Sequence, residues 1–377
     1  MSKRIALRIV LALLALLLIG GGGWILSLPP APAAIAAPPL AQGEAEAMLA
    51  ALRPPRPRRP LIAIIGINSG TETTDYLMPY GILRRADVAD VVALATGPGP
   101  VRLFPALTVM PQATTAAFDA RHPEGADYVI VPAMHRDDDP AALAWIRAQA
   151  AKGAIVIGVC AGAKVVAAAG LLDGRRATTH WYYLDGMLDR HPAIRYVPDR
   201  RIVVDGRIAT TTGITASMPM MLTLVEAIAG RTRAESVARG LGIARWDARH
   251  ASAAFRFNRP FALSAIGNTM AFWNHEELGL PLAPGVDEVS LALVADAWSR
   301  TYRSQARTFA AGPGALTSRN GLSIVPDEVA AAWPAERQMP IGIQPPARAL
   351  DAALSAIETR YGRGTVNLVA MQLEYPR

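Results

Sequence analysis

The chain contains a single cysteine, Cys160, which lies where an apolar stretch gives way to an alanine-rich one. The run Gly158-Val159-Cys160-Ala161-Gly162 has small residues on both sides of the sulfur, which permit the sharp strand-to-helix turn of a nucleophile elbow. A thiol beside the N-terminal end of a helix is stabilised as a thiolate, so we expect its pKa to be lowered. The alternative is a small buried apolar side chain, as free cysteines commonly are. The position of Cys160 at this turn favours the first alternative, a thiol at a nucleophile elbow.

The composition narrows the classes of protein to which this chain can belong. Of its 377 residues, 51% are hydrophobic and 18% are charged, which excludes a disordered or fibrous chain. The net charge of +7 comes mostly from scattered arginines, so we expect no nucleic-acid partner. One cysteine excludes an intramolecular disulfide, and neither the six histidines nor any glycine-rich loop has the spacing of a metal or cofactor site. We therefore expect neither a metal nor a cofactor.

Short apolar runs alternate with helical stretches between residues 61 and 245, which is typical of a parallel sheet with helices on both faces. The pattern predicts an α/β domain whose last apolar run leads directly to the cysteine. The expected strands are Leu61 to Gly66, Val91 to Ala95, Asp127 to Pro132 and Ala154 to Val159, and the expected helices are Thr74 to Arg85, Asp139 to Lys152 and Ala161 to Leu171.

Three segments of this region resemble the DJ-1/PfpI family, which belongs to the class I glutamine-amidotransferase-like superfamily. They are GVCAGA at 158–163, GLLDGRRATTHW at 170–181 and TTGITASMPMMLTLVEAIAG at 211–230. The resemblance covers roughly residues 61 to 245. It is closest to the amidase-like domain of AraC-type regulators, although no helix-turn-helix pattern follows. It implies a flavodoxin-like α/β sandwich.

The resemblance also implies roles for individual residues. It places the nucleophile at Cys160, and at His180 an imidazole that carries a proton or orients a substrate. The family has an acid near the sulfur, four positions before a proline; with Pro79 as the anchor this acid is Asp75, and Glu72 is the fallback. A carboxyl group that touches a thiol couples the two titrations. The alternatives are a helix N-terminal acid at Asp75 and a hydrogen-bonded strand-end histidine at His180.

Two departures from the family pattern bear on the expected activity. Ala161 follows the cysteine where protease-like branches often have histidine, so a protease is not expected. Ala133-Met134-His135 stands where amidotransferases have a Gly-Gly pair, which changes one element of an oxyanion hole. The expected oxyanion and pocket residues are Ala161, Gly162, Ala133 and His135, with Glu72 beside them.

The N-terminal region predicts a membrane anchor. Basic residues at positions 3, 4 and 8 precede an uncharged stretch from Ile9 to Leu28, which as a helix spans about 30 Å, the thickness of a bilayer core. The positive-inside rule places the N-terminus in the cytoplasm and the rest outside, in the periplasm if the source is bacterial. We favour a single-pass inner-membrane anchor; the alternative is a signal peptide cleaved near Ala34, which would release a secreted protein. Residues 29 to 60 contain nine prolines and predict a semi-rigid linker.

Residues 246 to 377 predict a degenerate partial second copy of the first domain, packed on it. A shift of 215 positions places Arg85 on Arg300, and a shift of 132 places Gly230 on Gly362. The 83 positions that separate the two registers hold, in the first copy, the elbow of Cys160. The alternative is a chance match between turns and amphipathic helices.

Two functions remain open at this point. The first is a membrane-anchored, cysteine-dependent amidase, hydrolase or hydratase that acts on a small molecule. The second is a non-catalytic sensor of a small molecule or of the redox state, in which the thiol oxidises reversibly. In either case the expected partners are a small-molecule ligand and the membrane, together with a second copy in a homodimer or the C-terminal lobe in an internal pseudo-dimer.

Overall fold

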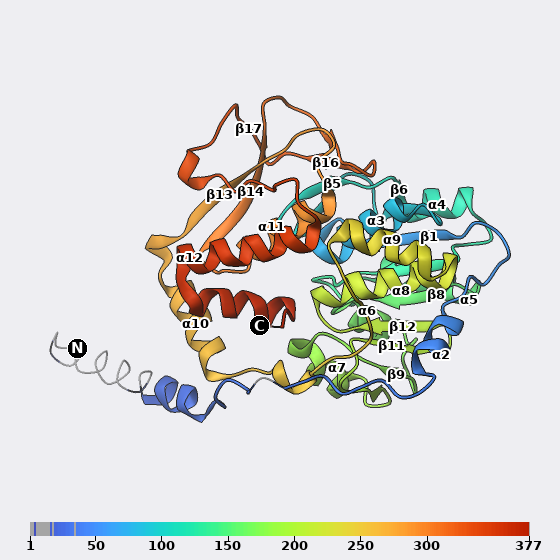
Figure 1. Cartoon of the computed structure of the whole chain (residues 1–377), viewed down its shortest axis with the longest axis horizontal. Coiled ribbons are helices and arrows are strands. Elements are labelled where there is room, and N and C mark those ends of the chain that lie inside the picture. Colours follow the sequence, from blue (N-terminus) through green and yellow to red (C-terminus); the bar gives the residue numbers. More distant parts are fainter. Residues whose placement is uncertain (1–3, 5–15, 17–18, 34, 377) are drawn as a thin grey trace.

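The computed structural model describes residues 4, 16, 19–33 and 35–376, and it is built around a seven-stranded sheet (Figure 1). All neighbouring strands of this sheet are parallel except the first pair, which is antiparallel. The predicted α/β sandwich with a parallel sheet is confirmed. In spatial order the strands are β11 (Ile202–Asp205), β12 (Ile208–Thr211), β8 (Ile155–Gly158), β7 (Tyr128–Val131), β1 (Leu61–Gly66), β3 (Asp90–Ala95) and β6 (Ala113–Thr114).

Helices cover both faces of this sheet and divide the interior into two cores. Successive residues of β1 alternate between the cores: Ile62 and Ile64 belong to one, and Ala63 and Ile65 to the other. Because both faces are covered, the strand sequence is continuously apolar. One face carries α3 (Thr73–Ala86), α8 (Ser217–Ala229) and α9 (Arg231–Leu241); the other carries α4 (Thr115–Arg121), α5 (Pro140–Ala151), α6 (Gly162–Ala168) and α7 (Leu184–Arg190).

The C-terminal part of the chain forms a smaller lobe against α3. It contains a three-stranded parallel sheet with the order β13 (Glu276–Pro281), β14 (Ser304–Ala310) and β17 (Glu328–Val329). Its helices are α10 (Arg259–Met270), α11 (Glu288–Ser299) and α12 (Pro346–Leu373). The remaining short elements are β9 (Arg176–Ala177), β10 (Arg195–Tyr196), η1 (Trp181–Tyr183), η2 (Ile214–Ala216), η3 (Ser252–Ala254), η4 (Phe272–Asn274) and η5 (Ala335–Arg337).

The elements of the smaller lobe follow those of the first lobe at a nearly constant interval. The first strand of each lobe begins at Leu61 and at Glu276, and the following helix begins at Thr73 and at Glu288, which are both 215 positions apart. The same interval separates β6 from β17 and β5 (Thr108–Met110) from β16 (Ser323–Val325). The intervals that the sequence suggested are therefore also intervals between equivalent structural elements.

A five-stranded sheet joins the two lobes. Its order is β15 (Leu316–Thr317), β16, β5, β4 (Val101–Phe104) and β2 (Ser69–Glu72), so that β16 of the small lobe pairs with β5 of the first lobe. The pairing is antiparallel and places Val109 opposite Ile324, the residue 215 positions later. This is the register that a two-fold axis between the lobes would produce.

A second correspondence lies in the last helices. Gly230 separates α8 from α9 with φ 82° and ψ 168°, and Gly362 interrupts α12 with φ 84° and ψ 171°. A positive φ in this region is readily adopted only by glycine. Each glycine therefore ends one helix and begins the next at the same bend.

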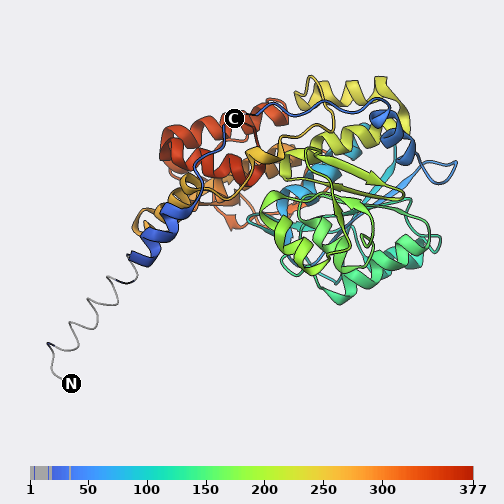
Figure 2. The same cartoon turned by 90° about the horizontal axis from the view of Figure 1, so that it is seen from below.

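The predicted membrane segment, Ile9 to Leu28, lies mostly outside the described residues. Within the part of the chain that the structure describes, no helix combines the length and the apolar character needed to cross a bilayer. Residues 19–27 are helical and leave the body of the molecule beside α10 (Figure 2).

The proline-rich segment 29–60 lies against the first lobe. It contains α2 (Glu44–Ala51), in which Glu44 forms an ion pair with Arg200. Leu52 is fully buried, and Arg56 reaches the buried carboxylate of Asp127 at 3.0 Å. Although the composition predicted a spacer, the side chains between the prolines hold most of this segment on the domain.

Candidate active site

Cys160 lies at a strained turn between β8 and α6. Its φ is 55°, a left-handed conformation that is uncommon for a residue with a side chain, and its N–H donates to Thr211 Oγ1 at 2.9 Å. The turn requires Gly162, because a Cβ there would lie 2.0 Å from the carbonyl oxygen of Val131. The predicted elbow is therefore present in the backbone.

Asp75 is a buried acid that interacts with this thiol. It is fully buried in the first turn of α3; its Oδ2 accepts a hydrogen bond from Ala133 N at 3.1 Å, and its Oδ1 accepts none from the described residues. Burial raises its pKa to about 7, although the Ala133 N–H and the Cys160 thiol act in the opposite direction. The carboxyl group therefore exchanges its proton near neutral pH.

The expected lowering of the thiol pKa is wrong. Burial raises the pKa of Cys160, and the carboxylates of Asp75, Glu72 and Glu374 raise it further. A hydrogen bond from the Ala161 N–H favours the thiolate but does not outweigh them. The helix beyond the elbow has seven residues, which is too little to offset burial and three acids. In the resting site the proton therefore stays on sulfur.

His180 lines the cavity that contains the Cys160 thiol, and both its ring nitrogens form hydrogen bonds. Nδ1 accepts from Tyr182 N at 3.1 Å, so Nε2 carries the proton and donates to the carbonyl oxygen of Gln372 at 2.9 Å. Burial lowers the pKa of the ring. A neutral imidazole held in this way positions the wall of the cavity and has no nitrogen free to take the thiol proton.

The expected oxyanion donors differ in whether their backbone N–H groups already donate a hydrogen bond to another residue. The Ala161 N–H acts on the sulfur, whereas the Gly162 N–H donates to Val159 O at 2.7 Å and the Ala133 N–H donates to Asp75. His135 lines the cavity, and its ring centroid is 4.3 Å from that of Phe104. Of the three expected backbone donors, the Ala161 N–H is the one that faces the reacting group.

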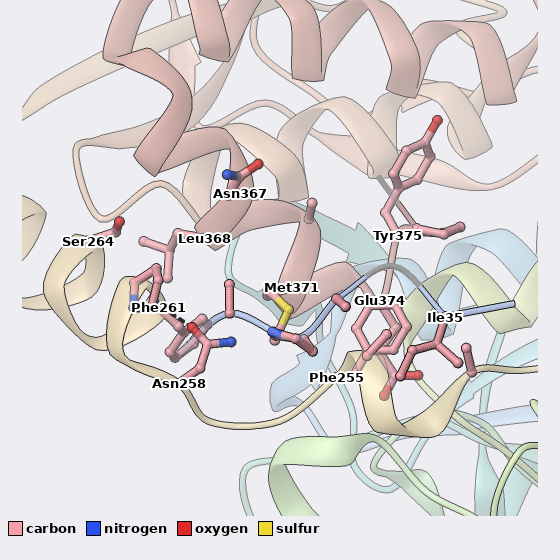
Figure 3. A pocket seen from close by; sticks show the side chains of 18 of the residues that line it. Ile35, Phe255, Asn258, Phe261, Ser264, Asn367, Leu368, Met371, Glu374 and Tyr375 are labelled. Atoms are coloured by element: carbon pink, nitrogen blue, oxygen red, sulfur yellow. Dashed lines mark hydrogen bonds between the residues drawn. The ribbon is translucent and has the colours of Figure 1, made fainter. Parts of the chain in front are cut away.

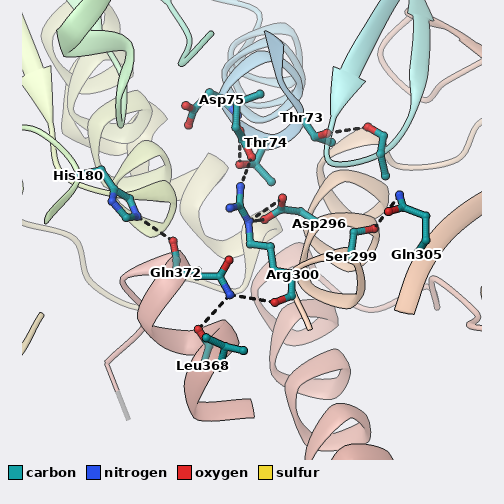
Figure 4. Close-up of polar contacts among 12 residues, drawn as sticks. Thr73, Thr74, Asp75, His180, Asp296, Ser299, Arg300, Gln305, Leu368 and Gln372 are labelled. Atoms are coloured by element: carbon teal, nitrogen blue, oxygen red, sulfur yellow. Dashed lines mark hydrogen bonds and ion pairs between the residues drawn. The ribbon is translucent and has the colours of Figure 1, made fainter. Parts of the chain in front are cut away.

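The carboxylate of Glu72 connects the start of α3 to the small lobe. Its Oε2 caps α3 by accepting from Asp75 N at 2.6 Å, and its Oε1 accepts from Arg300 of the small lobe at 2.8 Å. Arg300 also donates from Nε to both carboxylate oxygens of Asp296, at 2.9 and 2.7 Å (Figure 4). The pKa of Glu72 is raised by burial and by Asp75 and Asp296, and Arg300 opposes this. One guanidinium therefore compensates a cluster of three buried acids.

The cavity at Cys160 has a volume of about 490 Å³ and is shared by the two lobes. The first lobe contributes the thiol and Lys164, and the small lobe contributes Phe261 of α10, Arg300 and Tyr302. A volume in this range suits a small organic molecule. Its other aromatic lining residues are Phe104, Trp181, Tyr182, Tyr183 and Phe257.

A larger cavity of about 730 Å³ lies between residues 31–33 and 35–37, residues 250–258, α10 and α12 (Figure 3). Its lining is mainly apolar, with the carboxylate of Glu374 and the ring of His250 at 3.3 Å from one another. Glu374 also accepts from Trp181 N at 2.8 Å. Cys160 lines the smaller cavity and is not among the described residues that line the larger one, so the thiol chemistry belongs to the smaller.

Several residues of the site were not among the predicted ones. Arg300, Tyr302 and Gln372 come from the small lobe, which composition and motifs did not connect with the cysteine. The signal for Arg300 was present, because the shift of 215 positions aligned it with Arg85. No comparable pattern marked Tyr302 or Gln372.

Part of this chain is similar to known proteins. The sequence matches the DJ-1/PfpI family over residues 62–227. Isonitrile hydratase of Pseudomonas putida is 43% identical over 101 residues, which are 26% of this chain and 42% of that protein. The transcriptional regulator CdhR of Pseudomonas aeruginosa is 40% identical over 86 residues, 23% of this chain and 25% of the regulator. The chain thus spans less than half the length of either relative.

More distant relatives match over a longer stretch. The Parkinson disease protein 7 homolog of Danio rerio is 27% identical over 183 residues, 46% of this chain and 93% of that protein. The crystal structure of Drosophila melanogaster DJ-1beta has a TM-score of 0.45 and 22% identity, covering 50% of this chain and all of the other. Asp75, Cys160 and His180 lie within the matched residues 62–227, and because of this match the chain contains a DJ-1/PfpI family domain.

Proposed function

We propose that Cys160 and Asp75 catalyse the hydration of a carbon–nitrogen multiple bond in a small uncharged molecule, with an organic isonitrile as the favoured substrate. The observation that carries the proposal is a buried thiol that keeps its proton beside a carboxyl group with a pKa of about 7. Such a pair activates a neutral substrate by adding a proton as the sulfur attacks. The similarity to an isonitrile hydratase supports the choice of substrate.

The proposed reaction consumes one water molecule. Sulfur bonds to the terminal carbon of the isonitrile, and the thiol proton passes through Asp75 to that same carbon, which gives a thioimidate. Water then adds to this carbon while the nitrogen takes a proton. The carbon–sulfur bond breaks, the hydroxyl proton returns to sulfur through Asp75, and an N-substituted formamide leaves. Asp75 thus carries a proton in both halves, which a carboxyl group that titrates near neutrality does efficiently.

Arg300 and His180 act as positioning residues in this proposal. Arg300 holds Glu72, and Glu72 holds the N–H of Asp75, so the guanidinium fixes the acid without touching the thiol. His180 fixes the C-terminal end of α12 through Gln372. The aromatic lining favours an apolar substituent on the substrate.

The test is turnover of benzyl isocyanide by the full chain, followed by chromatography of N-benzylformamide. We expect Cys160→Ser to abolish product and Asp75→Asn to lower kcat by at least a hundredfold, because each removes a group that bonds to or protonates the reacting carbon. Ser290→Ala, at the position equivalent to Asp75 in the small lobe, is the matched control and should leave turnover unchanged. Equal turnover by Cys160→Ser would contradict the mechanism.

A ligand sensor is the alternative function. The similarity to transcriptional regulators supports it, as does the small number of free donors around the thiol. In that case benzyl isocyanide and related amides would bind, measured by calorimetry, without any product. Peroxide-dependent addition of oxygen mass at Cys160 would indicate a redox sensor.

We also propose that residues 9–28 anchor the chain in a bacterial inner membrane with both lobes in the periplasm. The uncharged apolar stretch and its basic flank support this. The test is flotation of the full chain with lipid vesicles, compared with a chain that starts at residue 29.

We further propose that the two lobes form an internal pseudo-dimer. The constant interval between equivalent elements and the pairing of Val109 with Ile324 support this. Residues 246–377 expressed alone should then show no cooperative thermal transition, because the surface that they bury against the first lobe would be exposed. A sharp transition would contradict the pseudo-dimer.

A further inference from the structure

A stripe of large apolar side chains is exposed on the outer face of α10 and on the turn that follows it. Leu263, Ile266, Met270, Phe272 and Trp273, which we call the α10 stripe, are between 40% and 72% exposed. Single exposed apolar residues are ordinary, but five of them within eleven positions are not. Such a concentration of exposed apolar side chains is typical of an interaction surface.

The α10 stripe is not the side of the helix that packs in the protein interior. Residues 263, 266 and 270 are spaced to lie on one side of the helix. The opposite side is buried: Phe261 reaches the Cys160 cavity, and Asn268 donates to Thr301 O at 2.8 Å and to Thr365 Oγ1 at 3.0 Å. A helix with one face packed in this way normally presents mainly polar residues outward, whereas α10 exposes Leu263, Ile266 and Met270.

The start of α10 holds the end of the N-terminal helix. The Arg259 N–H donates to Pro29 O at 2.9 Å, and its guanidinium donates to the carbonyl oxygens of Leu26 at 2.7 Å and of Ile25 and Leu28 at 3.2 Å. The rings of Trp24 and Phe257 are 6.1 Å apart. Both views show this helix leaving the body next to α10 (Figures 1 and 2).

We propose that the α10 stripe lies on the surface of a lipid bilayer and fixes the height of the Cys160 cavity above it. This proposal rests on the proposed anchor. The uncharged stretch ends at Leu28, and the guanidinium of Arg259 donates to the carbonyl oxygens of Leu26 and Leu28 at this end. Because Arg259 begins α10, the boundary between lipid and water lies at α10. Trp24, Phe272 and Trp273 are the aromatic residues expected at that boundary. A helix with an apolar face that lies flat there buries that face among the headgroups.

The experiment uses the full chain in vesicles of phosphatidylcholine with a minority of phosphatidylglycerol. In a Cys160→Ser background, nitroxide labels are attached at Ile266→Cys, at Met270→Cys and, as the matched control, at Val329→Cys. Val329 is 59% exposed and lies in β17, away from the N-terminal helix (Figure 1). We expect accessibility to oxygen relative to a water-soluble nickel chelate to be several-fold higher at 266 and 270 than at 329.

The outcomes separate the anchor from the stripe. If the labelled chains float with vesicles but positions 266 and 270 are as accessible to nickel as position 329, the anchor holds and the stripe proposal is overturned. If the chains do not float, the anchor fails and the stripe proposal fails with it. If the labels are protected without lipid and show spin–spin broadening that rises with protein concentration, the stripe is a contact between copies, which also overturns the proposal.

Discussion

The two lobes present the same ion pair twice, and only one of the pairs serves the candidate active site. Glu72 caps α3 and binds Arg300 at 2.8 Å, while Asp287 caps α11 and binds Arg85 at 2.8 Å. Each acid lies 215 positions from its counterpart, as does each arginine. Such an exchange of partners is what a two-fold interface produces.

The pairs differ in what surrounds the arginine. Four residues before Arg300 stands Asp296, whose carboxylate holds Nε, whereas Arg85 donates from Nε to the carbonyl oxygen of Gly81 at 3.1 Å. Asp75 has Ser290 as its counterpart in the small lobe. The capped helix and the ion pair that both lobes have are therefore not sufficient for the candidate site. The site also needs the acids at 75 and 296 and the segment with the cysteine.

The largest difference is expected when each arginine is neutralised. Arg300→Gln leaves Glu72 and Asp296 buried with no cation, so we expect the free energy of unfolding to fall by about 3 kcal/mol. Arg85→Gln leaves Asp287 with Arg319 at 3.5 Å and its helix cap, and should cost about 1 kcal/mol. Urea unfolding of both variants measures this. Equal losses would show that the neighbouring acids do not distinguish the two lobes.

Asp75 is expected to contribute to the pH dependence of stability, together with the buried Glu72 and Asp296, whose pKa values are also raised. The pKa of Asp75 is about 7 in the folded protein and about 3.9 when unfolded, so the folded state binds the extra proton between these values. Its contribution to stability should therefore decrease as the pH rises from about 4 to about 7, by an amount on the order of a few kcal/mol, and stay level above that.

Asp75→Asn should flatten this part of the pH profile, and Ser290→Ala should not. Chemical unfolding at several pH values provides the measurement. A wild-type profile that rises with pH in this window would mean that Asp75 is ionised in the folded protein throughout.

The reactivity of the thiol should respond to the same pair of variants. Asp75→Asn removes a carboxylate that raises the pKa of Cys160, so this pKa should fall and alkylation at a fixed pH below it should become faster. Ser290→Ala should leave the rate unchanged. Slower alkylation in Asp75→Asn would indicate that the carboxylate activates the thiol as a base.

The smallest effect is expected at the two helix-breaking glycines. A Cβ added at Gly230 or at Gly362 would have no neighbouring atom of the described residues within 4 Å, so alanine meets only the cost of a positive φ. Each Gly→Ala change should lower the free energy of unfolding by about 1 kcal/mol, and the two should add. A large inequality would mean that the two bends are not equivalent.

Much of the fold was predictable, because it depends on local patterns. The four expected strands coincide with β1, β3, β7 and β8 to within two residues, since a strand buried on both faces is continuously apolar. The interval of 215 positions was visible because bends and helix ends need particular residues. The packing of residues 29–60 was not predictable, since it depends on ion pairs with partners far along the chain.

The site was less predictable than the fold. The elbow at Cys160 follows from local sequence, but the pKa of its thiol depends on Asp75, Glu72 and Glu374, which distant segments bring together. The sequence left open whether His180 carries a proton, orients a substrate or is a hydrogen-bonded strand-end histidine, and the contact of its Nε2 with Gln372 on the last helix could not be predicted. Charges and hydrogen bonds between remote segments have no signature in a single sequence.

Because Val109 pairs with Ile324 inside one chain, the two paired strands are encoded by different codons. In an assembly of identical subunits every substitution near a symmetry axis appears twice, so an acid that is useful on one side is imposed on the other. Here Asp296 stands beside Arg300 while Gly81 stands 215 positions earlier, where any Cβ would lie 2.5 Å from Glu288 and Val289. An acid that is placed in one lobe of a single chain is therefore not imposed on the other lobe.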